Sequence, residues 1–463
     1  MKMIIQLSDH FEYKRLLRFT LPSIMMMIFT SIYGVVDGFF VSNFVGKTAF
    51  AAVNFIMPFL MILGTVGFMF GSGGSAIVSK TLGEGDPEKA NRLFSLFVYV
   101  SVALSAAISV AAFIFLPVIA RALGADKEML GGCVVYGRII IAAVPAFVLQ
   151  MEFQSFFVTA EKPMLGLYST IASGVANMIL DAAFMGLFKW GIAGAAIATA
   201  ISQIIGAVIP LVYFGRENDS LLRLGGTRFD GAALFKACTN GSSELMSNIS
   251  MSLVGMLYNI QLMKHAGQNG VAAYGVLMYV NMVFIAIFIG YSIGVAPVVG
   301  YHYGARNYGE LQSLLSKSSL LVGVSSALML AAGELLGPLF SGIFVSYDKE
   351  LYDLTLRGFR IFPFSFLFAG FSIFASSFFT ALSNGLTSAL ISFLRTLVFQ
   401  SAAVILLPLV WKTDGIWISI VAAEFVSCAV STLFIFAKRG KYHYISNRGI
   451  FKNAEKTSLY TAE

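Results

Sequence analysis

Charged residues are scarce in this chain of 463 amino acids. They make up 12% of it, and 57% of the residues are hydrophobic, whereas a typical soluble domain is about 25% charged. Cysteine is rarer still: the three cysteines stand far apart, each at or within an apolar stretch, which excludes a disulfide framework. The four histidines show no metal-ligand spacing. We therefore expect no cofactor and no structural metal.

Nucleotide-binding and catalytic motifs are also missing. The chain has no GxxxxGK[ST] sequence, so we do not expect ATP to drive it directly. The glycine-rich "GSGGS" from Gly71 lies in an apolar run, where close helix contact explains it better than phosphate binding. No hydrolase or metalloenzyme signature is present, and we do not expect an enzyme. The net charge of +7 sits in short loops and tails, a pattern that excludes a nucleic-acid partner and is typical of membrane orientation.

Long apolar segments are what the chain does contain. About 20 apolar residues are enough for a helix to cross the hydrocarbon core, and the first segment, after "YKRLLRF", is too long for a signal peptide. The sequence therefore predicts an all-α polytopic membrane protein with twelve transmembrane helices. The segments are 16–42, 50–78, 93–118, 130–157, 163–187, 191–214, 237–264, 271–299, 314–338, 351–379, 386–410 and 414–437.

The two halves of the chain repeat. "GKTAFAAVNFIMPF" from Gly46 matches "GQNGVAAYGVLMYV" from Gly267, and "LGEGDPEKANRLFS" from Leu82 matches "YGARNYGELQSLLS" from Tyr303, both at an offset of 221 residues. An even number of helices in each half predicts two six-helix bundles related by a pseudo-two-fold axis along the membrane normal. We expect a first lobe at 1–215, a cytoplasmic linker at 216–236, a second lobe at 237–437 and a cytoplasmic tail at 438–463.

Lysine and arginine predict the orientation. With both termini in the cytoplasm, the cytoplasmic segments hold 20 of the 31 basic residues and the opposite loops hold seven. We therefore expect a multi-pass protein of the cytoplasmic membrane. On that side, Asp86 is predicted to cap the helix that Pro87 begins, and Asn307 is its counterpart in the second half.

Four polar residues stand out in the first half. Asp181 lies in an apolar segment four residues after Asn177, so both share one helix face; Asp37 and Thr199 lie in helices 1 and 6. A rise of about 1.5 Å per residue places all four roughly 8–15 Å from the outer helix ends. Acids inside a membrane often mark an ion or proton pathway. The group can share a proton or cage Na⁺ with its oxygens; the structural alternative is a polar knot that fixes helix packing.

The second half lacks this acid pair, since the offset places Tyr258 opposite Asp37 and Ala402 opposite Asp181. Instead, Arg395 and Glu424 lie near mid-depth in neighbouring helices. We expect a buried ion pair, which is either structural or functional.

Two further acids lie near the cytoplasmic side. Glu244 and Glu152 can each either touch a cationic substrate from the inside or reach headgroup water, and for Glu152 headgroup water is the favoured expectation. Met25, Met278 and Met282 can form an adaptable apolar surface for varied ligands; ordinary packing is the alternative for each methionine.

Order and spacing of these motifs resemble the MATE (multidrug and toxic compound extrusion) transporters. "VDGFFVSNFVG" and "LGEGDPEKA" carry the resemblance to the family, which covers essentially the whole chain. "GSSELMSNISMSLV" and "SFLRTLVFQ" look closest to its bacterial MepA-like/DinF-like branch. The resemblance implies that the ion site uses Asp37, Asn177, Asp181 and Thr199. The acid that some relatives carry on helix 10 has no match near "FAGFSIFASSFF".

The resemblance also implies a function. The protein is expected to be a secondary antiporter that exports amphipathic or cationic organic compounds in exchange for H⁺ or Na⁺. We also expect a monomer. Cation binding is expected to bend helix 1 near Pro22 or Gly34. Two alternatives remain open: a flippase for a lipid-linked saccharide precursor, and a membrane-embedded enzyme or receptor module.

Overall fold

The computed structural model describes residues 5–125, 127–346 and 348–445, and all regular elements in these ranges are helices. The elements of the first lobe are α1 (Tyr13–Phe40), η1 (Val41–Val45), α2 (Lys47–Gly83), α3 (Pro87–Leu123), α4 (Lys127–Thr159), α5 (Pro163–Asp181), η2 (Ala182–Leu187) and α6 (Gly191–Gly215). The elements of the second lobe are α7 (Gly231–Gly304), α8 (Tyr308–Val345), α9 (Lys349–Phe359), η3 (Phe362–Ser365), α10 (Phe366–Ala381), α11 (Gly385–Phe393), η4 (Leu394–Phe399), α12 (Gln400–Leu406) and α13 (Pro408–Tyr442).

These elements make twelve membrane crossings. Eleven helical stretches are long and apolar enough to span a bilayer, and one of them is the 74-residue α7. At about 1.5 Å per residue α7 is far longer than a hydrocarbon core of roughly 30 Å. Gly267 breaks it into two crossings, with φ 60° and ψ −152°. The predicted twelve-helix fold is confirmed, although α7 begins at Gly231, earlier than the segment at 237 predicts.

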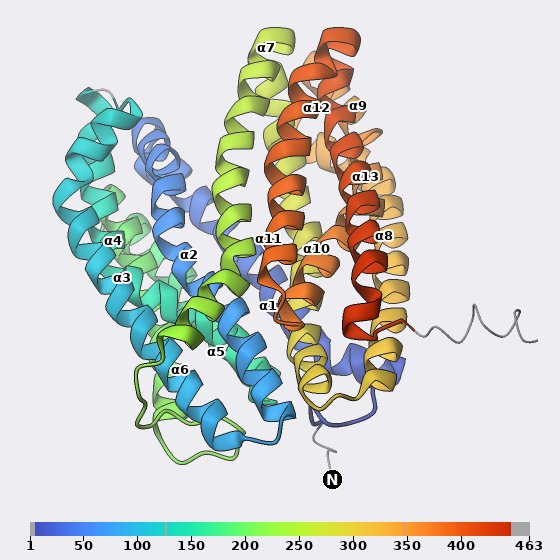
Figure 1. Cartoon of the computed structure of the whole chain (residues 1–463). Coiled ribbons are helices and arrows are strands. Elements are labelled where there is room, and N and C mark those ends of the chain that lie inside the picture. The colour runs from blue at the N-terminus through green and yellow to red at the C-terminus, as the bar shows by residue number, and fades with distance from the viewer. Residues whose placement is uncertain (1–4, 126, 347, 446–463) are drawn as a thin grey trace, which may run out of the picture.

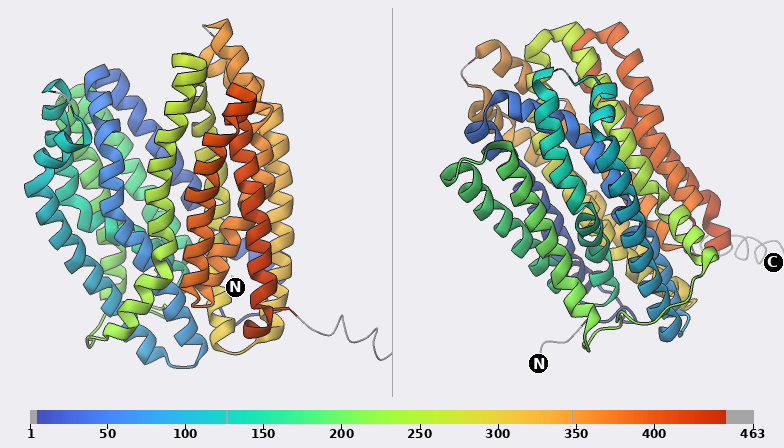
Figure 2. Two further views of the ribbon diagram at one scale, coloured as in Figure 1. Left: turned by 45° about the horizontal axis from the view of Figure 1, so that its top comes forward. Right: turned by 90° about the vertical axis from the view of Figure 1, so that its left-hand side faces the viewer.

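Each set of six crossings is built mainly around one buried hydrophobic cluster. One buried cluster gathers residues of α2, α3, α4 and α6, and the other gathers residues of α7, α8, α10 and α13. Figure 1 shows the two bundles side by side, with α3 and α4 on the outer flank of one and α8 and α13 on the outer flank of the other. The first and last described residues lie at the same end of the molecule (Figure 2), which we call the termini end. Residues 446–463 of the predicted tail lie outside the described residues.

The lobes meet backbone to backbone at the termini end, and the contact is symmetric. A Cβ atom on Gly83 would lie 2.0 Å from the carbonyl oxygen of Tyr301, and one on Gly304 would lie 2.0 Å from that of Lys80. Both pairs are related by the 221-residue offset, since Lys80 corresponds to Tyr301 and Gly83 to Gly304. Only glycine permits this approach of α2 to α7. The reciprocal contact is what a pseudo-two-fold axis between the lobes produces.

Residues 5–12, which we call the N-terminal strap, join both lobes. The Leu7 N–H donates to Glu161 Oε1 at 2.6 Å in the first lobe. The Phe11 N–H donates to Glu310 Oε1 at 2.9 Å in the second lobe, where His10 Nδ1 lies 2.5 Å from Glu310 Oε2. Leu7 and Phe11 are fully buried. The strap therefore holds the termini end of both lobes together.

Both predicted helix caps beside this contact are confirmed. The Asp86 carboxylate accepts from the Lys89 N–H at 3.0 Å at the start of α3. The Asn307 side chain accepts from the Glu310 N–H at 3.2 Å at the start of α8. Each cap satisfies a backbone donor that the first helical turn leaves free.

Candidate functional site

Asp37 and Asp181 come together inside the first lobe. Asp181 is the last residue of α5 and is fully buried, while Asp37 lies near the end of α1 and is partly exposed. Their carboxyl groups lie next to each other. Neither oxygen of Asp181, nor Asp37 Oδ1, accepts a hydrogen bond. Because these three adjacent carboxyl oxygens are shielded from solvent and have no donors, the pair needs a proton or a cation; an uncompensated buried charge is costly.

Asn177 lies on α5, one turn before Asp181, and Thr199 lies on α6. Asn177 is 1% exposed, and both polar atoms of its side chain lack a hydrogen-bond partner. The Thr199 hydroxyl on α6 donates to the Ala195 carbonyl at 3.1 Å. The site thus concentrates unpaired oxygen atoms on α1 and α5, with α6 beside them.

Tyr136 belongs to this group, although the sequence did not indicate it. Its side chain on α4 is fully buried, and its phenol lies beside Thr199 and faces both Asp37 and Asp181. The surrounding run "VVYGRIIIAAV" reads as an ordinary apolar helix. A phenol can both donate and accept a hydrogen bond. Tyr136 can therefore bond to either protonation state of the acid pair.

The helices widen one turn after Asp37 and directly after Asp181. The π-helical turn η1 (Val41–Val45) follows the end of α1, and the π-helical turn η2 (Ala182–Leu187) begins at the residue after Asp181. Such turns are rare and occur frequently at functional sites, because they leave backbone groups less tightly paired. The backbone beside the site is therefore suited to local rearrangement.

A chain of hydrogen bonds ties α4, α5 and α6 together below the acids. Gln150 Nε2 donates to Ser173 Oγ at 3.2 Å, and the Ser173 hydroxyl donates to the Ser202 carbonyl at 2.7 Å. The Ser202 hydroxyl in turn donates to the Thr199 carbonyl at 2.8 Å. These bonds fix the depth at which Thr199 meets α5.

The expectation for Glu152 was wrong. Its side chain is fully buried and accepts a hydrogen bond from Ser101 on α3, so it does not reach headgroup water. The position of Glu152 along α4 indicated a residue near the cytoplasmic membrane surface. Its side chain instead packs between α4 and α3. Glu152 Oε1 has no partner.

Arg395 and Glu424 form an ion pair inside the second lobe. Arg395 Nε donates to both oxygens of Glu424, at 3.1 and 2.8 Å, and Gln400 Nε2 lies 3.4 Å from Glu424 Oε1. Arg395 lies on the π-helical turn η4, and the two side chains are 15% and 4% exposed. The predicted partners therefore do meet. Their role in transport stays a prediction.

The remaining candidates are not brought into this site. Glu244 on α7 is partly exposed, and no side-chain partner is seen for it among the described residues. Met25 and Met282 are both 46% exposed. The Ser31 hydroxyl lies 3.4 Å from the Met282 carbonyl, so Ser31 and Met282 lie at the contact of α1 with α7. Met278 Sδ lies 3.9 Å from Asn281 Nδ2.

No metal centre is apparent in the part of the chain that the structure describes. There, no group of three or more His, Cys, Asp or Glu side chains could hold a metal ion. The acid pair supplies only two carboxylates, and further ligands for a hard cation would be amide, hydroxyl or backbone oxygens.

Two lobes of six spanning helices, with a pair of carboxylic acids buried in one of them, define a membrane transporter with internal repeats. The chain belongs to the MatE family: the family model matches residues 22–183 and 245–404, one stretch in each lobe. It is a multi-pass membrane transporter and not an enzyme, and the predicted family is confirmed.

Relatives cover nearly the whole chain. Multidrug export protein MepA of Staphylococcus aureus (strain MRSA252) is 24% identical over 430 residues, which cover 93% of this chain and 94% of that protein. Its namesake in Staphylococcus saprophyticus is 23% identical over the same length. Among solved structures, "Crystal structure of MATE in complex with MaL6" and "Outward-facing conformation of a multidrug resistance MATE family transporter of the MOP superfamily" both give a TM-score of 0.90 at 21% identity. Each covers 96% of this chain and 100% of its own.

Proposed function

We propose that this protein is a cation-coupled antiporter that exports amphipathic, cationic organic compounds by alternating access. The observation that carries the proposal is the donor-free carboxyl pair Asp37/Asp181. The names of the relatives support the substrate class, since they are multidrug export proteins. The protein acts as a monomer in the cytoplasmic membrane, with both termini in the cytoplasm.

The proposed coupling ion is a proton shared by the two acids. Adjacent carboxyls cannot both ionise without strong repulsion, so one proton is held between them. Asn177 and Tyr136 complete the polar surroundings of that proton. Loss of the proton leaves two like charges side by side and favours their separation. The π-helical turns that follow Asp37 by one turn and Asp181 directly let α1 and α5 move apart, with Pro22 or Gly34 as the place where α1 bends.

Transport assays with purified protein in liposomes test this function. Under an imposed pH gradient, Asp181→Asn and Asp37→Asn should each lower the export of a cationic dye by about 5- to 150-fold, the usual range of a coupling free energy between two sites. Glu152→Gln is the matched control, because it removes a buried acid of the same lobe that lies outside the pair; it should export at the normal rate.

Two results would overturn parts of the proposal. Normal export by Asp181→Asn would remove the acid pair from the mechanism. Export that follows a Na⁺ gradient and ignores a pH gradient would replace the shared proton by a sodium ion, for which the carboxyl, amide and hydroxyl oxygens of the same site are the ligands.

A further inference from the structure

A basic cavity lies at the termini end, away from the acid pair. It has a volume of about 970 Å³. Its walls are the first turns of α3 and the segment just before α7, residues 226–231. Lys89, Arg92 and Arg228 line it, and Asp230 is the one acid in its lining. Among the described residues, Lys89 and Arg228 have no ion-pair partner, and Arg92 approaches Glu88 only at 3.9 Å.

The linker wall of this cavity is fastened to α3 by hydrogen bonds. The Arg223 N–H donates to Asn91 Oδ1 at 2.7 Å, and the Gly225 N–H donates to Ser95 Oγ at 3.0 Å. The Thr227 hydroxyl donates to the Arg92 carbonyl at 2.7 Å. These bonds hold Arg228 beside Lys89 and Arg92 on α3. The cations therefore form a built cluster and not a chance meeting of flexible loops.

The one acid of the cavity is already engaged. Asp230 caps α7, since its Oδ1 accepts from the Ala233 N–H at 2.9 Å. Three cationic side chains against one carboxylate leave the lining with an excess of two positive charges. The chemistry of the site suits an anion with several oxygen acceptors, such as a phosphate group.

The depth of the cavity places it at the membrane surface. Helix α3 has 37 residues, which at about 1.5 Å per residue gives a length of roughly 55 Å, well beyond a hydrocarbon core of about 30 Å. About eight residues at each end must therefore lie in the headgroup layer or beyond it. Lys89 and Arg92 fall in these residues. Farther along, α3 exposes the apolar side chains Val110, Ile114 and Val118, as a lipid-facing helix does.

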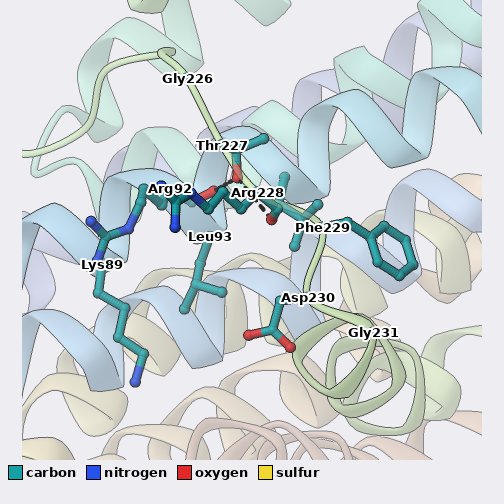
Figure 3. Close-up of a pocket in the computed structure, with 10 residues that line it drawn as sticks. Lys89, Arg92, Leu93, Gly226, Thr227, Arg228, Phe229, Asp230 and Gly231 are labelled. Carbon is teal, nitrogen blue, oxygen red and sulfur yellow. Dashed lines mark hydrogen bonds between the residues drawn. The ribbon is translucent and has the colours of Figure 1, made fainter.

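An exposed aromatic residue adjoins the cations. Phe229 is 82% exposed, and Figure 3 shows its ring pointing away from the basic side chains. Aromatic and apolar side chains beside a cationic cluster are typical of segments that lie in the membrane interface. The ring can enter the acyl region of a lipid whose headgroup the cations bind.

We propose that the cavity formed by Lys89, Arg92 and Arg228 binds the phosphate of an anionic phospholipid, with Phe229 against its acyl chains. The bound lipid fastens the linker and the start of α7 to α3 of the first lobe. This site is separate from the acid pair and does not depend on the proposed export function.

Binding of lipid to purified full-length protein tests the proposal. Delipidated protein is titrated with phosphatidylglycerol, and bound lipids are counted by native mass spectrometry. Phosphatidylcholine with the same acyl chains tests for the anionic headgroup. Replacement of Lys89, Arg92 and Arg228 by Gln should weaken phosphatidylglycerol binding by about tenfold or more, since each basic residue near a membrane surface contributes appreciably to anionic-lipid attraction.

A second triple variant, Lys438→Gln/Arg439→Gln/Lys441→Gln, is the matched control. It removes the same number of charges from the last two turns of α13, at the same end of the molecule and outside the cavity. It should bind phosphatidylglycerol as the unmodified protein does. An equal loss in both triple variants would show diffuse attraction to basic loops and would overturn the site.

Two further measurements use the unmodified protein. In the unmodified protein, phosphatidylglycerol but not phosphatidylcholine should slow amide hydrogen exchange in residues 226–231; no difference would overturn the site without recourse to variants. Glycerol phosphate, which has the headgroup chemistry but no chains, should fail to displace the lipid at equal concentration. Displacement at equal concentration would assign the cavity to a soluble phosphate compound instead.

Discussion

The phenol oxygen of Tyr258 lies 2.9 Å from Ser419 Oγ, at the position of the second lobe that corresponds to Asp37 in the first. The Tyr258 ring also stacks on Tyr274, with ring centroids 5.3 Å apart. The second lobe thus fills this position with a buried aromatic residue whose only polar atom already has a partner. The repeat preserves the helices but places the adjacent acid pair in the first lobe, so cation coupling is expected to reside in the first lobe alone.

Removal of the Tyr136 hydroxyl should alter coupling. Tyr136→Phe retains the buried ring but takes away the group that faces Asp37, Asp181 and Thr199. A hydrogen bond from this hydroxyl to one protonation state of the acid pair is worth about 1 kcal/mol, so its removal should shift the proton or Na⁺ concentration for half-maximal export roughly fivefold. Tyr258→Phe is the control: it loses a buried hydrogen bond in the other lobe, and its ion dependence should stay unchanged. Equal shifts in both variants would remove Tyr136 from the site.

Breaking the Arg395–Glu424 pair should destabilise the protein strongly. Arg395→Met or Glu424→Met leaves one buried charge without its partner, which typically costs about 3–5 kcal/mol, whereas the double variant should recover most of that loss. Thermal unfolding in detergent measures the stability, and dye export of the double variant measures the function. Normal export by the double variant would make the pair structural. Single variants as stable as the double variant would contradict the buried ion pair.

Much of this architecture was predictable, because long apolar runs and the 221-residue repeat are one-dimensional signals. Asp37 and Asp181 could be found because acids are so unusual in such runs. Tyr136 could not, since a tyrosine in an apolar helix is ordinary until its direction is known. Glu152 was misplaced for the same reason: its sequence position indicates depth along α4 but not that Ser101 of α3 lies beside it. The lobe boundaries and the roles of the site residues stay predictions.

The symmetric glycine contact predicts a defined conformational effect. Gly83→Ala or Gly304→Ala would place a Cβ atom 2.0 Å from a backbone carbonyl of the other lobe, and overpacking of this kind costs about 1–3 kcal/mol. The lobes should therefore separate at the termini end. Distances between spin labels at Glu88 and Lys441 measure this separation, and both variants should lengthen it. Gly215→Ala, where nothing lies within 4 Å of the added atom, is the control. Unchanged distances in all variants would contradict a tight contact.

The N-terminal strap should loosen as the pH rises. Burial raises the pKa of the Glu161 carboxyl, while the hydrogen bond from the Leu7 N–H lowers it in part. A carboxyl with a raised pKa contributes stability that is complete below its ordinary value and is lost as the pH rises through the raised one. Amide hydrogen exchange in residues 5–12 should therefore be slower near pH 5 than at neutral pH, after correction for its intrinsic pH dependence. Both pH values lie above the ordinary glutamate pKa of about 4.3. Glu161→Gln keeps an acceptor for Leu7 but cannot ionise, and His10 and Glu310 are the same in both proteins. The difference in exchange between the two proteins therefore reports on Glu161. If Glu161→Gln kept the full pH dependence of the unmodified protein, the strap would respond to another group.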